Sequence, residues 1–314
     1  MKKVMRFIKN NIVGFLIGVL FCCVTIVLAE SINSNEVLYD NSNSSSSATD
    51  VQGAIDDVYN TLDKVGSGYS LIAHAPKGLS TELIAGLYRF QGVEDTNNTV
   101  DNYICFGTTS KSDCTSNTDA YMYRIIGISS NGQLKLIKKE ALNTVYKWNS
   151  SYNVDWAHSS LYAGLNGSYF LNNTTYVPDS SWSNRIVASD WHYYTSTDTT
   201  ISTIAERELG AETVNAKIGL MYLHDYAYAL ATPAYSNTSW IHLSKNDTSA
   251  PSGYEWIISR HSTINAWLVR SDGKVSFSTY GMTDSYSVRP VFYLRSGERI
   301  ASGSGTIDDP YILS

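Results

Sequence analysis

An uncharged apolar run from Ile12 to Ala29 is the first strong pattern along the chain. Four basic residues precede it, and it ends in Val27-Leu28-Ala29, with small residues where a signal peptidase requires them. The run is long for a signal peptide and just long enough to span a bilayer. Residues 1–29 are therefore predicted to be either a cleaved signal peptide or an N-terminal membrane anchor with its positive charges inside. Either outcome places the rest of the chain in the secreted or cell-surface compartment.

A short heptad pattern follows a linker rich in Ser and Asn, residues 30–48. Thr49 and Gln52 form a capping-box pattern, which predicts a helix over residues 49–66 that ends at Gly66-Ser67-Gly68. Its apolar seam consists of Val51, Ile55, Val58, Leu62 and Val65. Two interpretations stay open: a neck that joins the chain into a homo-oligomer, or an amphipathic helix that docks on the body of a monomer.

Residues 70–314 have the pattern of an α+β domain with antiparallel pairing. Asn131-Gly132 separates strand-like runs at 121–128 and 133–138, and Asp272-Gly273 separates runs at 266–270 and 274–277. Each dipeptide is a strong hairpin signal. A further strand is expected over 288–294, where Pro290 predicts an edge position or a bulge.

The same region predicts two helices and two more short strands. Ser159 is a candidate cap for a helix that carries Leu161, Leu165 and Tyr169, and residues 203–209 form an acid-rich helical segment. Residues 185–188 and 217–222 are strand candidates. The strand–helix alternation of a parallel doubly wound sheet is missing from the pattern.

Two cysteines lie outside the apolar run, Cys105 and Cys114. A structural disulfide between them suits an oxidising compartment. A metal site would need more Cys or His nearby, and a redox pair is usually more closely spaced. The disulfide is the prediction.

The order of several motifs resembles a family of bacterial extracellular domains of unknown function, found in secreted and surface proteins of Gram-positive gut bacteria. The motifs are NYICFG at 102–107, YRIIGI at 123–128, LKLIKK at 134–139, IGLMY at 218–222, WLVR at 267–270, VRPVFYL at 288–294 and GTIDDPY at 305–311. The family is similar to domains with the C-type-lectin-like fold, including the formylglycine-generating-enzyme branch. This resemblance implies a compact body with two helices, a small antiparallel sheet and long loops.

Two departures limit what this resemblance implies about chemistry. Calcium-dependent lectins pair acidic and amide ligands in fixed loops, whereas Lys245-Asn246-Asp247 lacks the flanking residues of that pattern. Formylglycine-generating enzymes use two cysteines late in the domain, whereas these lie at its start. We expect no metal ion and no cofactor.

Charge excludes one class of partner. The 314 residues carry a formal net charge of -6, and four of the 23 basic residues belong to the N-terminal segment. No basic stripe remains to neutralise phosphates, so no nucleic acid is expected as a partner. The 23 tyrosines among few charges are typical of a binding surface, and codon bias is an equal explanation.

Candidate chemistry is sparse. His224-Asp225 is the one adjacent His–carboxylate pair, either an oriented base or a hydrogen-bonded strand end. Arg289 is either an anion contact or a buried residue paired to a carboxylate or to carbonyls. Asp308-Asp309 is either a calcium site or the cap of a turn, and the turn is favoured.

Aromatic residues on polar segments are the candidates for ligand binding. Trp267 alternates with Val269 and is expected in the core. The candidate ligand-binding residues are Trp191, Tyr193, Tyr194, Trp240, Trp256 and Arg270. For any single tryptophan, burial in the core is the favoured alternative, and at least one exposed aromatic cluster is expected. The sequence favours a non-enzymatic, adhesin-like module that binds an extracellular glycan or protein. A structural envelope or filament subunit and a surface enzyme acting on glycans are the alternatives.

Overall fold

The computed structural model describes residues 49–51, 67–93, 100–195, 200–235, 238–243, 253–276 and 281–314. The chain divides into two units, Met1–Asp63 and Lys64–Ser314, and the elements below belong to the second. The predicted apolar segment, the linker and the heptad seam except Val51 lie outside the described residues. Within those ranges, no helix combines the length and the apolar character that crossing a membrane requires.

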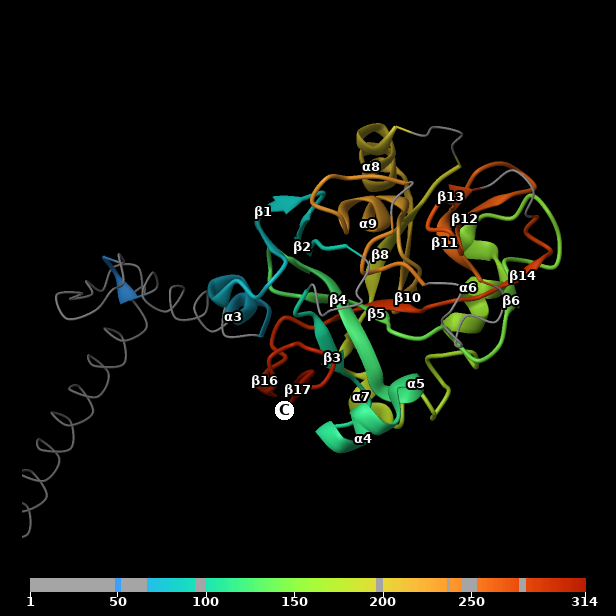
Figure 1. The fold of residues 1–314 in the computed structure, drawn as a ribbon. Coiled ribbons are helices and arrows are strands. Elements are labelled where there is room, and N and C mark those ends of the chain that lie inside the picture. The colour runs from blue at the N-terminus through green and yellow to red at the C-terminus, as the bar shows by residue number, and fades with distance from the viewer. Residues whose placement is uncertain are drawn as a thin grey trace, which may run out of the picture. The chain divides into compact units, whose positions relative to one another are not determined.

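A curled, mostly antiparallel sheet forms the framework of the second unit (Figure 1). Its central path runs β10-β15-β5-β4-β3-β17-β16, with β1, β2 and β7 attached at the sides. β17 pairs with β3 in parallel, and the other pairs are antiparallel. The strands are β1 (Leu79–Ile84), β2 (Leu87–Phe90), β3 (Tyr103–Cys105), β4 (Met122–Ser129), β5 (Leu134–Lys138), β7 (Ile186–Val187), β10 (Ile218–Gly219), β15 (Val291–Leu294), β16 (Ile300–Ser302) and β17 (Tyr311–Leu313).

The β4–β5 hairpin confirms the prediction made from Asn131-Gly132. Gly132 has φ +80°, a conformation that glycine adopts without the steric cost of a side chain. Nearly every residue of both strands is buried, because both faces of the sheet are covered. This explains why the two runs lack a clean alternation of apolar and polar residues.

Pro290 was expected at a sheet edge or in a bulge, and that prediction is wrong. β15 lies inside the sheet, with β5 on one side and β10 and β7 on the other. Pro290 directly precedes the strand, and its carbonyl accepts a hydrogen bond from the Lys138 backbone N–H at 3.2 Å. The ring therefore removes no donor from the strand ladder.

Smaller sheets pack beside the main one. A three-stranded sheet contains β11 (Tyr254–Arg260), β12 (Ala266–Arg270) and β13 (Val275–Ser276), and it confirms the hairpin predicted at Asp272-Gly273. Two ribbons complete the strands: β8 (Ser189–Tyr193) with β9 (Glu212–Ala216), and β6 (Tyr146–Lys147) with β14 (Ser285–Tyr286).

The described helices are short. They are α3 (Ser67–His74), α4 (Lys111–Ser116), α5 (Thr118–Tyr121), the 3-10 turn η2 (Trp156–His158), α6 (Ser160–Leu165), α7 (Ser180–Ser183), α8 (Ile201–Gly210) and α9 (Leu223–Tyr228).

Both predicted helices are present, as α6 and α8. The Ser159 hydroxyl caps α6 by accepting the Tyr162 backbone N–H at 3.0 Å. α6 ends before Tyr169, and the buried strand expected at 217–222 is limited to residues 218–219. Gly68, predicted to lie in a helix terminator, is inside α3. A Cβ there would collide with the Gly132 carbonyl, so glycine lets α3 rest on the β4–β5 turn.

One continuous core joins these layers. Trp148, Trp156, Trp191 and Trp256 are fully buried within it, and Trp267 is buried as expected. Its rings meet in tilted, edge-on and stacked pairs, for example Trp148 tilted against Trp156 with centroids 5.3 Å apart and Phe170 stacked on Tyr176.

A disulfide joins Cys105 of β3 to Cys114 of α4, as predicted. Both sulfur atoms are buried in a small cluster with Tyr103, Met122 and Ile312. The bond closes a loop with a sequence separation of 9 and fixes α4 to the strand that β17 pairs with.

Reduction of this disulfide is expected to lower the free energy of unfolding by about 2–3 kcal/mol, because a loop of this length is constrained in the unfolded chain. Urea unfolding of oxidised protein, reduced protein and a Cys105→Ala/Cys114→Ala variant measures the difference. Equal stability in the three samples, or free thiols at Cys105 and Cys114 in the oxidised sample, would contradict it.

Candidate functional site

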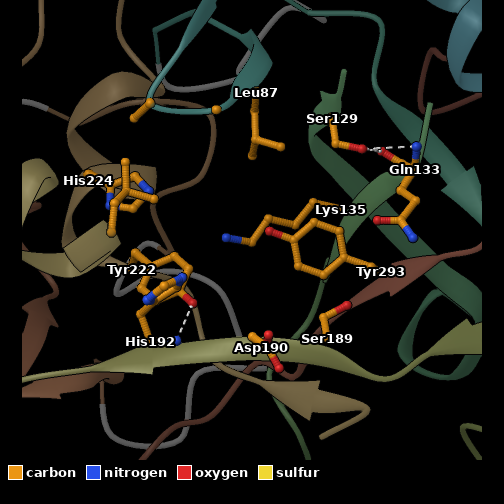
Figure 2. Close-up of a pocket in the computed structure, with 13 residues that line it drawn as sticks. Leu87, Ser129, Gln133, Lys135, Ser189, Asp190, His192, Tyr222, His224 and Tyr293 are labelled. Carbon is orange, nitrogen blue, oxygen red and sulfur yellow. Dashed lines mark hydrogen bonds between the residues drawn. The ribbon is translucent and has the colours of Figure 1, made fainter. Parts of the chain in front are cut away.

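A pocket of about 260 Å³ opens between the main sheet, the β8–β9 ribbon and the neighbouring helices α8 and α9 (Figure 2). Its lining combines amide, hydroxyl, imidazole and carboxylate groups with two tyrosine rings and two leucines. The lining residues are Ala85, Gly86, Leu87, Ser129, Gln133, Lys135, Ser189, Asp190, His192, Leu209, Tyr222, His224 and Tyr293.

Lys135 forms the floor of this pocket. It belongs to β5 and is fully buried, with its Nζ 2.6 Å from Asp225 Oδ2 and 4.2 Å from the centre of the Tyr222 ring. Burial lowers the pKa of Lys135, and the attraction of Asp225 opposes this effect. The Lys135 ammonium group loses its hydration on burial and instead contacts the Asp225 carboxylate and the face of the Tyr222 ring.

Asp225 is held by two cations and one backbone N–H group. Lys135 contacts its Oδ2, Arg89 Nη1 donates to its Oδ1 at 2.8 Å, and the Tyr222 backbone N–H donates to Oδ2 at 2.9 Å. Burial opposes ionisation of this carboxyl, but Lys135 and Arg89 together hold its pKa well below the ordinary value. Asp225 is therefore a fixed anion at the start of α9.

Glu208 and His224 form a second buried pair beside the first. His224 Nδ1 lies 2.6 Å from Glu208 Oε2, and Glu208 also accepts the backbone N–H groups of Leu223 and His224 and the Ser259 hydroxyl. The adjacent His224 and Asp225 therefore have different main partners: His224 contacts Glu208, and Asp225 contacts Lys135 and Arg89. Between the two neighbours, His224 Nε2 is 3.8 Å from Asp225 Oδ1. The pair begins helix α9, so the alternative of a strand end is wrong.

The rim of the pocket is tied to this network. Arg89 Nε donates to the Ile84 carbonyl at 2.7 Å and Nη2 to the Ala85 carbonyl at 3.3 Å, which anchors the β1–β2 turn. The Tyr222 hydroxyl accepts the His192 backbone N–H at 2.9 Å (Figure 2). Burial raises the pKa of both Tyr222 and Tyr293, so both hydroxyls are neutral donors at physiological pH.

The three tryptophans predicted as ligand contacts are buried instead of exposed on loops. Trp191 is fully buried with its ring centre 5.7 Å from Lys135 Nζ, and its indole N–H donates to the Ala216 carbonyl at 3.0 Å. Trp240 donates to the Phe90 carbonyl and packs on Arg124, and Trp256 donates to the Tyr146 carbonyl. For these three tryptophans the alternative of burial in the core is correct, because each indole finds its acceptor there.

The other predicted contacts lie at partly exposed positions outside the pocket lining. Tyr193 and Tyr194 are half-buried and follow His192 along the chain. Arg270 ends β12, with its Nε 3.4 Å from Asp272 Oδ1. The structure thus brings none of the six predicted binding residues into the pocket wall.

The structure shows the surroundings of Arg289 and of the Asp308-Asp309 turn. Arg289 is buried and makes a bidentate pair with Glu255, both contacts at 2.8 Å, and it also donates to the Ile241 carbonyl. Asp309 closes a turn through backbone hydrogen bonds from Ser304 and Gly305 and pairs with Lys111. The described ranges contain no group of three or more acidic, His or Cys side chains placed to hold a metal ion.

Comparison of the chain with protein-family models, with curated proteins and with solved structures gives no match. The family resemblance drawn from the order of the motifs stays a prediction.

Asp225→Asn is expected to lower the free energy of unfolding by about 3–5 kcal/mol, because it leaves Lys135 and Arg89 buried without a counter-ion. Asp309→Asn is the matched control. It makes the same chemical change in an ion pair whose side chains are 50% and 42% exposed, and about 0–1 kcal/mol is expected. Equal losses in urea unfolding of the two variants would contradict a special role for the buried anion.

A second buried lysine on β5 gives a pH-dependent prediction. Burial lowers the pKa of Lys138 to about 8, and its Nζ donates to the Asp119 carbonyl. An unfolded lysine has a pKa of about 10.4, so between about pH 8 and pH 10.4 the unfolded chain binds more protons than the folded one. The Lys138 contribution to stability therefore rises with pH across this window, by up to about 3 kcal/mol.

Urea unfolding of the wild type and of Lys138→Met between pH 7 and pH 10 isolates this contribution, because the other titrating groups are common to both proteins. The stability of the wild type relative to the variant is expected to increase with pH. Two parallel curves would refute the lowered pKa.

Proposed function

We propose that the chain is a secreted or membrane-tethered bacterial surface protein whose C-type-lectin-like domain binds the terminal sugar of an extracellular glycan in the Lys135 pocket, without catalysis and without a metal ion. The observation that carries this proposal is the lining of the pocket. Hydrogen-bonding side chains, including the Asp190 carboxylate, surround two tyrosine side chains above the buried Lys135.

The chemistry of the lining suits a sugar ring. Gln133, Ser189 and His192 offer donors and acceptors for hydroxyl groups, and Tyr293 offers a ring and a hydroxyl directed into the same space (Figure 2). The volume of about 260 Å³ is below the ~300–1,000 Å³ of pockets for drug-sized ligands. A single terminal residue of a glycan fits this scale better than an internal stretch of chain.

The fixed floor supports binding in another way. Lys135, Asp225 and Arg89 hold one another, and Arg89 holds the β1–β2 turn at the rim. A ligand then orders few side chains when it binds, and the entropy cost of association is reduced.

The pairing of the titratable groups favours binding over catalysis. Glycoside hydrolysis uses two carboxyl groups on either side of the scissile bond. Of the described residues, Asp190 alone contributes a carboxylate to the lining. His224 and Lys135 are each engaged with a buried carboxylate, at 2.6 Å in both cases.

A glycan array probed with residues 30–314 tests the proposal. We expect saturable binding that EDTA does not change. Gln133→Ala and Asp190→Asn should each weaken binding about three- to tenfold, the value of one or two hydrogen bonds. The control is Asp309→Asn, because Asp309 does not line the pocket. An array without bound glycans, or binding that both pocket variants leave unchanged, would overturn the proposal.

A further inference from the structure

Two leucines interrupt the polar lining of the pocket. Leu87 comes from β2 and is buried, whereas Leu209 comes from α8 and is 45% exposed. The large hydrophobic side chains exposed in the described part of the chain are Leu83, Val93, Tyr152, Leu209 and Ile264. Leu209 is the member of this group that lines the pocket.

The position of Leu209 follows from how α8 is fixed. Ile204, Ala205 and Glu208 face inward, and Glu208 is locked there by His224, Ser259 and two backbone N–H groups. Successive helix positions are about 100° apart, so the residue after Glu208 is turned out of the core. The buried ion network thereby places an apolar side chain at the mouth of the pocket.

Leu87 lies away from the carboxylate of the pocket lining. Figure 2 shows Leu87, Ser129 and Gln133 toward one end of the view and the polar end with Ser189 and Asp190 at the other, with Lys135 and Tyr293 between them. A hydroxyl group turned toward leucine would lose its hydrogen bonds to water without gaining new ones. A methyl group in the same place would remove apolar surface from water.

We propose that the pocket selects a 2-acetamido sugar, an N-acetylhexosamine, over the corresponding simple hexose; this inference rests on the proposed function. The acetamido methyl packs against Leu209 and Leu87, while the ring hydroxyls meet the polar end. The acetamido N–H and carbonyl find partners of matching chemistry in Gln133 and Ser129. Burial of one methyl group corresponds to a preference of about fourfold.

The test is an NMR titration of residues 30–314 with four methyl glycosides: glucose, galactose, N-acetylglucosamine and N-acetylgalactosamine. We expect the wild type to bind at least one N-acetylated sugar about fourfold more tightly than its parent hexose. Leu209→Ala should reduce this ratio to about one or two, and Leu209→Met should restore it.

Leu83→Ala is the matched control. Leu83 is 46% exposed, lies on β1 and is absent from the lining, so its loss should leave the ratio unchanged. Equal affinity for hexoses and N-acetylated sugars would overturn this inference and leave the proposed function standing. A preference that survives Leu209→Ala, or that falls equally with Leu83→Ala, would also overturn it. Failure of all four sugars to bind would likewise overturn this inference, whereas the proposed function is overturned by the glycan array without bound glycans.

Discussion

The carboxylate of Asp225 is the contact on which the rest of the structure depends. It joins Lys135 of β5 to Arg89 of β2 and caps the start of α9, all away from water. Removing three charges from water is costly, and the mutual attraction compensates only when geometry is good and the remaining lone pairs are satisfied. Both carboxylate oxygens of Asp225 accept hydrogen bonds: Oδ1 from Arg89, and Oδ2 from Lys135 and the Tyr222 backbone N–H. The same contact fixes the pocket floor, the β1–β2 turn and, through the adjoining Glu208–His224 pair, the rotation of α8.

The parts of the fold that depend on neighbours in sequence were predictable. The β4–β5 and β12–β13 hairpins follow from Asn131-Gly132 and Asp272-Gly273, and the α6 cap follows from Ser159. The disulfide joins residues only 9 apart. In each case a few adjacent residues contain the decisive chemistry, so the local pattern is sufficient.

The candidate site could not be assembled in this way. Asp225 lies 90 residues after Lys135 and 136 after Arg89 in the chain. One signal was available: Lys135 and Lys138 stand inside an apolar run that becomes a fully buried strand. A charge in such a run requires a buried partner, but the pattern does not say which of the 29 acidic residues supplies it. The tryptophans were candidate ligand contacts for a related reason. Their polar neighbours in sequence suggest exposure, but they do not reveal the backbone carbonyls that accept the indole N–H groups inside the core.

The parallel pairing of β17 with β3 has a consequence for the order in which the molecule forms. β3 is among the first strands of the domain, and its second neighbour comes from residues 311–313. Local hairpins can form early, whereas this closure must bring together opposite ends of the domain, and such distant pairings slow folding. Until β17 docks, β3 presents an open edge next to the segment that the disulfide anchors. A chain synthesised from its N-terminus thus keeps this edge available to other strands for almost the whole time that the domain takes to emerge.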